Sequence, residues 1–421
     1  YSGHETGHQI SMPDHTNTLN LSFSPALPAR CLGELKDLAQ EVAVTSSALE
    51  GHIAESTARA LGDCLRYLNS YYSNLIEGHK TSILEIEDAL NKKFSQEGER
   101  RYAQELCAAH VLAEKKLMQD MLSDPPVNVC SLAFVGKIHR IFYQNFPQQH
   151  QYTHSQGGFT NYHVNPGELR DDNVSLDDGQ SAHGPDVGIL PEKYREFATT
   201  FDSRNFHGDE RLIAAAASHH RLTWLHPFRD GNGRVSRLFS GLYLTRIGIN
   251  RSNLWSLSRG FSRDKQWYML NLRSADSPNT EHTGFDQDFF ADYCLYFLET
   301  CLDQIRFMDR ILSLNRIEAR LDSYMRDRDK DRGAQNPLDP RAGKLLKALF
   351  LEGEIKRGKA RHVMGMEEKS ERQARRIVSQ LASEGLIQSE SHRAPLRIAF
   401  PTHVLRVYFP DLFDPSVLGE S

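Results

Sequence analysis

The chain has 421 residues, of which 39% are hydrophobic and 25% are charged, and its formal net charge at pH 7 is −5. This length exceeds one ordinary hydrophobic core, and the composition excludes an intrinsically disordered chain. The net charge excludes a basic, nucleic-acid-binding surface over the whole molecule, although it leaves room for one local basic module.

The six cysteines show neither CxxC spacing nor zinc-finger spacing to a histidine, and they lie at Cys31, Cys64, Cys107, Cys130, Cys294 and Cys301. In a chain of this size, such scattered cysteines are typical of reduced and buried thiols. The sequence holds no apolar run long enough to cross a bilayer, and it starts with a polar segment rather than a signal-peptide core. These observations predict a cytoplasmic protein without a membrane partner.

The first third of the chain is predicted to be helical after a short arm. Residues 1–30 are polar and carry three prolines, which predicts an extended arm. From Leu32 to Leu122 apolar residues recur at helical spacing, so we expect a helical region over residues 31–125. Asp124-Pro125-Pro126 ends this pattern, and a further helix is expected around Leu132–Phe142.

The middle of the chain begins with turn chemistry and then becomes helical again. Glycine and proline pairs between residues 150 and 190 predict loops and a small hairpin near residues 157–176. Helical patterns return at Glu192–Phe201 and Asp209–Leu225. One long amphipathic helix is expected from about Phe285 to Met325, so residues 126–325 are predicted to form a second, mostly helical region.

The last part of the chain is predicted to be a separate basic module. A charged run predicts a linker over residues 326–340. Three helical patterns and an extended hairpin follow over residues 341–401, which is the plan of a winged helix-turn-helix, and residues 402–421 are expected to be a tail. From Arg341 to Arg397 there are thirteen Lys or Arg and seven Asp or Glu, so charge is segregated between modules.

The segment from His226 to Arg237 carries the chemistry, and it reads His-Pro-Phe-Arg-Asp-Gly-Asn-Gly-Arg-Val-Ser-Arg. His226 can accept a proton near neutral pH, and Asp230 is a hard carboxylate suited to a divalent cation. Gly231 and Gly233 let successive backbone N–H groups face one anion, and the helical pattern that follows places them at a helix N-terminus.

Two arginines complete this segment. Arg234 and Arg237 are three residues apart, so they share one helical face and can both bind phosphate oxygens. A base, a metal ligand, a phosphate cradle and two arginines together indicate the transfer of a phosphorus-centred group from a nucleotide to a hydroxyl.

The run 226–237 resembles the Fic signature HxFx(D/E)GNGRxxR without a mismatch. A preceding helix that ends in Ser218-His219-His220-Arg221-Leu222 also resembles Fic domains, and we expect its two histidines to pack or hydrogen-bond near the site. Residues 268–276 are similar to the later YYxxLxxAD stretch of the family, although Met269 replaces the second tyrosine. The resemblance covers about residues 130–325.

The resemblance implies a role for each residue of the site. His226 would deprotonate the target hydroxyl, and Asp230 would hold Mg²⁺ against the phosphates of ATP. Asn232 and the backbone of its neighbouring glycines would cradle phosphate. The nucleotide-binding set that it implies is Phe228, which also packs the loop, Gly231, Asn232, Gly233, Arg234, Arg237 and Tyr268.

The residue at position 233 bears on the choice of donor group. Relatives that transfer phosphate, the Doc type, carry Lys where this chain has Gly233. The resemblance therefore implies a protein adenylyltransferase that moves AMP from ATP to a Ser, Thr or Tyr hydroxyl of a target protein.

A second resemblance lies upstream of the signature. Residues 73–78, Ser-Asn-Leu-Ile-Glu-Gly, match the inhibitory motif (S/T)xxxE(G/N) of Fic proteins. By this resemblance Ser73, Glu77 and Gly78 end an inhibitory helix, and Glu77 reaches Arg237, which the γ-phosphate of ATP needs. We therefore expect an enzyme that Glu77 holds inactive.

The expected architecture is mostly α: a Fic helical core with a small β-hairpin flap, and a C-terminal winged helix-turn-helix domain. The hairpin near residues 157–176 would align a target segment by strand addition. Gly167-Glu168-Leu169-Arg170 followed by Val174 resembles the flap pattern of the family, but His183-Gly184-Pro185-Asp186 stands where a Pro-Pro pair is common.

Several alternatives stay open from the sequence. The enzyme would remove AMP if Glu77 also positions water. The chain would instead be a DNA-binding regulator if the Fic core only senses nucleotide. A nucleic-acid groove, a docking protein or a homodimer would each suit the basic module, whose candidate contact residues are Ser370, Arg372, Gln373, Arg375 and Arg376. The sequence does not name the target protein.

Overall fold

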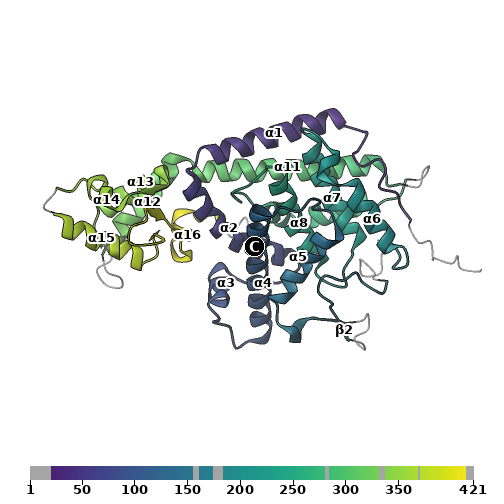
Figure 1. Cartoon of the computed structure of the whole chain (residues 1–421), viewed down its shortest axis with the longest axis horizontal. Helices are drawn as coiled ribbons and strands as arrows, with labels where there is room; N and C mark the ends of the chain where they lie inside the picture. Colours follow the sequence, from purple (N-terminus) through teal and green to yellow (C-terminus); the bar gives the residue numbers. More distant parts are fainter. Residues whose placement is uncertain are drawn as a thin grey trace, which may run out of the picture.

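In the computed structural model, most of the described chain folds into helices, and the strands are short (Figure 1). The structure describes residues 20–154, 161–173, 184–279, 284–330, 337–367 and 370–413. Within this part of the chain, the fold is mostly α, as the sequence predicts.

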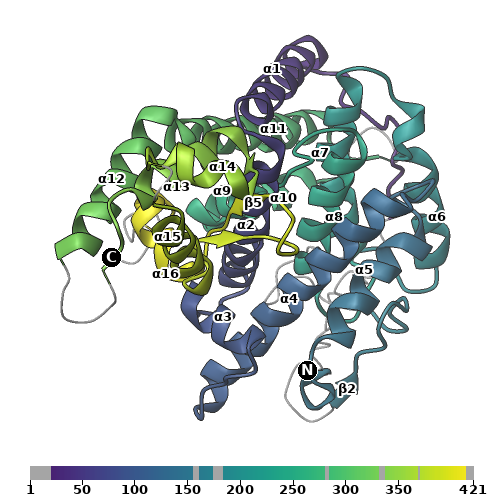
Figure 2. The ribbon, with the colours of Figure 1, turned by 60° about the vertical axis from the view of Figure 1, so that its left-hand side comes forward.

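The helices of the first 312 residues form what we call the helical body. Helix α1 runs along α11, and α2 lies between α4, α8 and α9 (Figures 1 and 2). The helices of this body are α1 Leu32–Gly51, α2 Glu55–Ile76, α3 Ile83–Leu90, α4 Gly98–Ser123, α5 Leu132–Gln144, α6 Leu190–Thr200, α7 Glu210–Leu225, α8 Asn232–Arg246, α9 Leu257–Arg263, α10 Lys265–Ala275 and α11 Gln287–Leu312, with 3-10 turns η1 Gln148–His150 and η2 Ser203–Asn205. The apolar periodicity of the sequence predicts the helical region that holds α1 to α4 and the separate helices α5, α6 and α7, but it gives no bounds for α9 and α10.

The expected long helix over residues 285–325 is two helices. Helix α11 ends at Leu312, and α12 Leu314–Lys330 begins after Ser313, whose ψ of 136° leaves the helical region. The apolar spacing continues across this break, so periodicity alone did not show it. Helix α12 also runs five residues into the predicted linker, and residues 331–336 lie outside the described part of the chain.

Residues 337–413, which we call the C-terminal module, contain α13 Ala342–Glu352, β3 Glu354–Ile355, α14 Arg357–Val363, α15 Glu371–Ser383, β4 Ile387–Gln388, β5 Leu396–Ile398, α16 Thr402–Tyr408 and η4 Pro410–Leu412. The strands pair antiparallel in the order β3-β5-β4. Three helices and the hairpin follow the predicted order, and β3 adds a strand that the sequence did not predict. The expected tail is folded as far as residue 413, because α16 buries Val404, Leu405 and Tyr408.

The hairpin lies earlier in the chain than predicted. Strand β1 Tyr152–His154 pairs antiparallel with β2 Asn161–His163, so the hairpin covers residues 152–163 rather than 157–176. The predicted pattern residue Val174 falls in residues 174–183, which lie outside the described residues. Turn residues such as Asn165-Pro166-Gly167 led the prediction too far along the chain, since they follow the hairpin instead of forming its tip.

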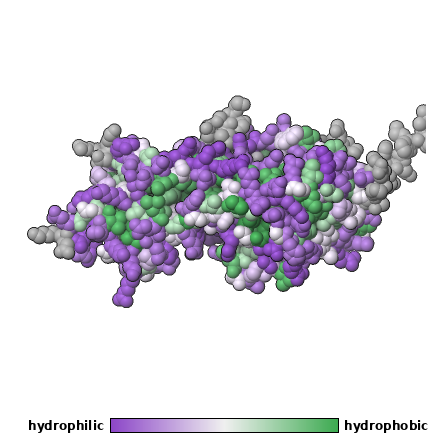
Figure 3. All heavy atoms as spheres, turned by 90° about the horizontal axis from the view of Figure 1, so that it is seen from above, coloured by the Kyte–Doolittle hydropathy of each residue, from purple (hydrophilic) through white to green (hydrophobic). Residues whose placement is uncertain are grey.

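The face of the molecule seen from above is mainly hydrophilic, with hydrophobic groups between polar side chains (Figure 3). The large apolar side chains that are exposed come from different parts of the chain. Examples are Leu122 of α4, Val127 in the loop after α4, and Trp267 of α10. Among the described residues, no helix has both the length and the apolar character needed to span a membrane.

Helix α2 lies close against the rest of the helical body at Gly62. A Cβ atom on Gly62 would collide with the backbone oxygen of Ser252, in the loop between α8 and α9. Backbone atoms cannot move aside as the end of a side chain can, so overpacking here costs about 1–3 kcal/mol.

We expect Gly62→Ala to lower the melting temperature, measured by thermal denaturation of the full chain. Gly241→Ala on α8 is the matched control, because a Cβ there meets no atom within 4 Å. Alanine has the higher helix propensity, so the control should keep or raise the melting temperature. Equal melting temperatures for the two variants would contradict the close approach of α2.

Candidate functional site

The loop between α7 and α8 is closed by its own side chains. His226 ends α7 in the left-handed region, with φ of 45°. Asn232 Oδ1 accepts a hydrogen bond from the Phe228 backbone N–H at 2.9 Å, and its Nδ2 donates to the Phe228 carbonyl at 2.7 Å. Phe228 is fully buried and stacks on the His139 ring, with ring centroids 4.1 Å apart. These contacts fix the loop as one turn around a buried ring.

Helix α8 starts at this turn with a free end. Gly231 caps it with φ of 77°, and as a glycine it has no side chain to pair with the first N–H groups. Unpaired N–H groups and the helix dipole make such an end a site for an anion. Gly233 lies at the same end, and a Cβ there would collide with Oε1 of Glu77. The carboxylate of Glu77 therefore lies directly on the anion site of α8.

Glu77 and Arg237 form an ion pair, as the sequence predicts. Arg237 Nη2 lies 2.5 Å from Glu77 Oε1, and the Arg237 side chain is 2% exposed. Arg237 also donates from Nε to Ser73 Oγ and from Nη2 to the Ser73 carbonyl, each at 2.9 Å. All three acceptors belong to the last turn of α2, so one buried guanidinium binds the whole end of this helix.

The end of α2 is shaped by Gly78. Gly78 has φ of 92°, and the N–H groups of Gly78 and His79 donate to the carbonyls of Leu75 and Asn74, each at 3.0 Å. This is the left-handed glycine that commonly ends a helix. It turns the chain away from the site while Glu77 stays on it.

The charge of Glu77 is held by two arginines. Burial raises the pKa of Glu77, whereas the positive charges of Arg237 and Arg234 lower it. The two charges outweigh burial, so the pKa of Glu77 lies below the usual glutamate range. Glu77 is therefore a carboxylate at neutral pH. Its side chain keeps 34% of its exposure, which leaves it open to exchange with another anion.

Asp230 is a second ionised carboxylate at the site. Its Oδ2 accepts a hydrogen bond from the Tyr143 hydroxyl at 2.5 Å and one from Arg234 Nη2 at 3.2 Å. Burial raises the pKa of Asp230, whereas Arg234 and the Tyr143 hydroxyl lower it below the ordinary aspartate range. The side chain is 40% exposed, and Mg²⁺ needs one or two carboxylates besides substrate phosphates, so Asp230 fits that ion.

His139 holds the backbone beside Asp230. Its Nδ1 accepts from the Gly167 N–H at 2.7 Å, and its Nε2 lies 3.2 Å from the Asp230 carbonyl. An acceptor at Nδ1 and a donor at Nε2 require the neutral imidazole. Burial lowers the pKa of His139 to about 4, which is consistent with that state.

His226 is neutral at pH 7. Burial lowers its pKa to about 4, the charge of Arg170 lowers it too, and Asp230 acts in the opposite direction. Arg170 donates from Nε to the His226 carbonyl at 2.9 Å, and its own N–H donates to the Pro227 carbonyl at 2.8 Å. A neutral imidazole can accept a proton, so His226 has the protonation state that a base needs.

Most of the predicted residues meet in one place. The site brings together residues from the turn, from α8 and from the last turn of α2, namely His226, Asp230, Gly231, Gly233, Arg234, Arg237, Ser73 and Glu77. Gly78 ends the helix beside them.

Three residues of the predicted nucleotide-binding set support the site from behind, and for Phe228 this agrees with its expected packing of the loop. Phe228 is enclosed, and the Asn232 amide pairs with the Phe228 backbone rather than facing an anion. Tyr268 is 2% exposed, and its hydroxyl lies 2.9 Å from His219 Nε2. The sequence showed that these residues belong together, but it did not distinguish a wall of the site from its support.

The two histidines of α7 pack near the site, as predicted. His219 Nδ1 lies 2.6 Å from the Ser240 hydroxyl of α8, and His220 Nε2 lies 3.0 Å from the Leu272 carbonyl of α10. Sequence reasoning missed Tyr143, His139 and Arg170 as parts of the site. Tyr143 and His139 share a face of α5 at i,i+4 spacing, but no sequence signal links that face to Asp230.

A helical fold with an anion-binding turn at a helix start, and with a buried arginine beside it, defines the class of protein. Residues 129–244 match the Fic/DOC family model. The match covers α7, the turn and most of α8 together.

Comparisons with known proteins agree. The chain is similar to protein adenylyltransferase Fic of Drosophila mojavensis, 37% identical over 90 residues, and of Drosophila melanogaster, 36% identical over 90 residues. Each match covers 20% of this chain, and 17% and 18% of those proteins, so the chain matches under a fifth of their length. The fold is similar to a Fic family protein of Desulfovibrio desulfuricans, with a TM-score of 0.50, 14% identity and coverage of 87% of this chain and 96% of that one.

The lowered pKa of Glu77 predicts how its ion pair depends on pH. A carboxylate whose pKa falls on folding stabilises the protein above its ordinary pKa, and this contribution is lost as the pH falls through the lowered value. We expect the melting temperature of the native chain to exceed that of Glu77→Gln by a constant amount between pH 6 and 8, and by less below about pH 4.

Thermal denaturation across this pH range measures the difference. Glu99→Gln is the matched control, because Glu99 is exposed on α4. It should melt with the native chain at neutral pH. A native advantage that grows on acidification would contradict the ion pair.

Proposed function

We propose that this chain is a protein adenylyltransferase that transfers AMP from ATP to a hydroxyl of a target protein, and that Glu77 holds it inactive. The observation that carries the proposal is the position of the Glu77 carboxylate, between the start of α8 and Arg237. A carboxylate there occupies the place and the donors that a phosphate group would use.

The residues of the site divide the reaction between them. His226 takes the proton of the target hydroxyl, whose oxygen attacks the α-phosphorus of ATP, and the bond to pyrophosphate breaks. The N–H groups at the start of α8, with Arg234 and Arg237, bind the phosphate oxygens. Asp230 is the residue that would hold Mg²⁺, which neutralises phosphate charge when bound.

The low pKa of His226 fits this role once the anion is present. Burial keeps the imidazole neutral, and a nearby triphosphate raises the pKa of a histidine because it stabilises the charged form. Bound substrate would therefore make His226 a stronger base at the step that needs one.

Glu77→Gly should raise AMP transfer strongly. Removal of the carboxylate frees Arg237 and the start of α8, and correct placement of the phosphates is worth on the order of 100-fold in rate. Incubation of the full chain with α-labelled ATP and Mg²⁺, followed by autoradiography of the chain itself, measures the change.

A second substitution in the same background tests the base. Glu77→Gly with His226→Ala should lose about 100-fold or more of the label, since only the proton acceptor is removed. His207→Ala, at an exposed histidine before α7, is the matched control and should keep full labelling. Equal labelling of native chain and Glu77→Gly would refute the inhibitory role of Glu77.

One alternative uses the same site in the other direction. Glu77 is ionised and one-third exposed, so it can also orient a water molecule toward an AMP-modified hydroxyl. Faster loss of label from pre-modified protein with native chain than with Glu77→Gly would favour this AMP-removing activity.

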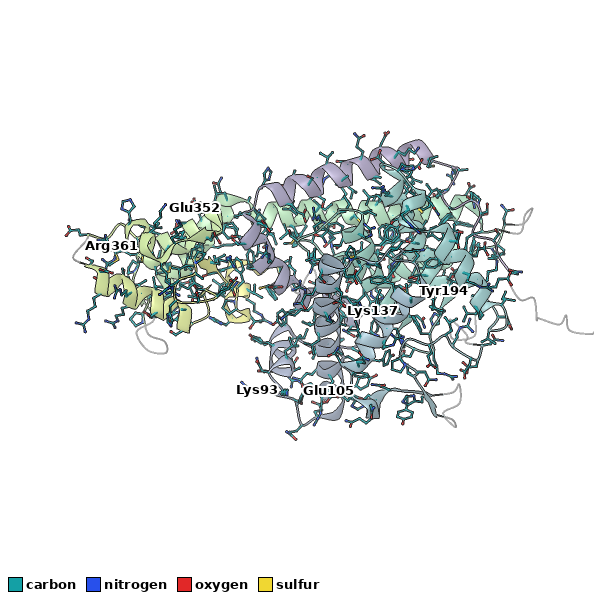
Figure 4. The ribbon with its side chains drawn as sticks, viewed as in Figure 1. Lys93, Glu105, Lys137, Tyr194, Glu352 and Arg361 are labelled. Carbon is teal, nitrogen blue, oxygen red and sulfur yellow. The ribbon has the colours of Figure 1, made fainter. Side chains whose placement is uncertain are left out.

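A second candidate function concerns the C-terminal module, which we propose is a winged helix-turn-helix. Helices α14 and α15 lie at the end of the molecule away from the helical body (Figure 1), with Arg361 of α14 toward that end (Figure 4). Arg372 and Arg376 are exposed on α15, whereas Arg375 pairs with Glu371 of the same helix at 2.5 Å. A recognition helix with an exposed basic face suits a DNA groove.

If the module binds DNA, the affinity of the full chain for a duplex should fall steeply with salt, because phosphate contacts release counterions. Arg372→Ala and Arg376→Ala should each reduce the salt slope by about 1. Arg195→Ala, at an exposed arginine of α6, is the control. A fluorescence anisotropy titration without binding at low salt would leave protein docking as the better hypothesis.

A further inference from the structure

One face of helix α2 is bound by the C-terminal module. Thr57, Cys64 and Tyr72 are spaced by seven and eight residues, so they lie on nearly one face of the helix. Each donates to a backbone carbonyl of the module: Thr57 Oγ1 to Phe350 at 3.0 Å, Cys64 Sγ to Phe400 at 3.0 Å, and the Tyr72 hydroxyl to Leu412 at 3.2 Å. The module is therefore held along the whole length of α2.

The opposite face of α2 contacts the other helices of the helical body. Asn69 Nδ2 donates to Glu114 Oε1 of α4 at 2.9 Å, and Ser70 Oγ donates to the Cys107 carbonyl at 2.8 Å. Ser73 and Glu77, one and two turns further, bind Arg237. Both views show α2 between the module and α4 (Figures 1 and 2). Glu352 of α13 lies on the side of the module that faces α2 (Figure 4).

The two faces are not packed alike. A cavity of about 40 Å³, lined by Asn69, His110, Glu114 and Arg237, lies between α2 and the helical body. Both ring nitrogens of His110 and Oε2 of Glu114 have no hydrogen-bond partner within the described residues. The cavity has room for a few waters, which these polar atoms would hold. On the module side, Thr57 and Tyr72 are almost fully buried, and a wider hollow of about 460 Å³ lies between Cys64 and Phe400.

The contact at Tyr72 reaches the inhibitory turn itself. Leu412 belongs to η4, which Asp411 fixes to α12 through Arg320 at 2.7 Å and Arg316 at 3.4 Å. Tyr72 immediately precedes Ser73, whose carbonyl and hydroxyl both bind Arg237. A shift of the C-terminal segment is therefore passed within one residue to the turn that blocks the site.

We propose that the C-terminal module holds α2 in the position from which Glu77 blocks Arg237, so that the seating of this module sets the rate of AMP transfer. The proposal rests on the proposed function and names its regulation. Loss of a module contact weakens the inhibitory position, and each hydrogen bond of about 1 kcal/mol corresponds to about fivefold in that equilibrium.

The test uses Thr57→Val and Tyr72→Phe in the full chain, because both keep the size of the side chain and remove a donor to the module. The Tyr72 hydroxyl is also hydrogen-bonded to Arg259 of α9, so Thr57→Val is the variant that changes the module contact alone. We expect each to raise AMP incorporation about fivefold, and to add nothing in the Glu77→Gly background. Thr199→Val is the matched control, since Thr199 also donates to a carbonyl, that of Arg195 within α6, but lies outside the module contact.

A second readout does not depend on activity. Hydrogen exchange at the amides of Gly78 and His79, which close the last turn of α2, should quicken in Thr57→Val and Tyr72→Phe and stay unchanged in Thr199→Val. Native exchange in both module variants would overturn the coupling, and so would a further rise of transfer in the Glu77→Gly background. Faster exchange in a chain whose Glu77→Gly form transfers no AMP would support the coupling and refute the proposed function.

Discussion

The site depends on one buried charge, the guanidinium of Arg237. A side chain that is 2% exposed cannot rely on water to stabilise its charge, so acceptors must surround it. Glu77 and Ser73 supply those acceptors from the end of a helix, 160 and 164 residues away from Arg237 in the chain. Removal of such a partner leaves a costly unpaired charge unless another anion replaces it. On the proposed function, carboxylate and phosphate are alternative partners of the same arginine, and their exchange would link inhibition to substrate binding.

The predictability of the site follows from how its residues are spaced in the chain. His226, Asp230, Gly231, Arg234 and Arg237 fall within twelve residues, so a single turn and one helix bring them together. Ser73 and Glu77 lie far from Arg237 in the chain, and spacing alone could not place them beside it. They were predictable because residues 73–78 resemble the inhibitory motif. Tyr143 had no such motif, and the flap pattern that contains Arg170 did not link it to His226. Both residues reach the turn through tertiary contacts that only the folded chain shows.

The helices were predictable from the helical spacing of their apolar residues. Elements whose position depends on a local turn were less predictable. Helices such as α5 and α7 have clear apolar faces, and their predicted bounds differ from the structure by few residues. The break at Ser313 interrupts the backbone without interrupting the apolar pattern. The hairpin and α16 are short, and short elements form only against the rest of the molecule. Asn232 shows the same limit for a side chain, since a polar amide in a glycine turn can face either an anion or the backbone.

The two-faced packing of α2 bears on how such a switch can be driven. A ligand shifts an equilibrium only by its differential affinity for the two states, and a change from 1% to 99% requires about 10⁴-fold. On the proposed function, ATP favours the open state only through the phosphate contacts that Glu77 blocks, above all the contact with Arg237. Contacts on the other face of α2 contribute to the same equilibrium without touching the nucleotide. Hydrogen bonds from Thr57, Cys64 and Tyr72 together stabilise one position of the helix, and their loss would act in the same direction as the arrival of phosphate at Arg237. A helix that carries the inhibitory carboxylate on one face and a second module on the other can therefore add the two inputs as free energies.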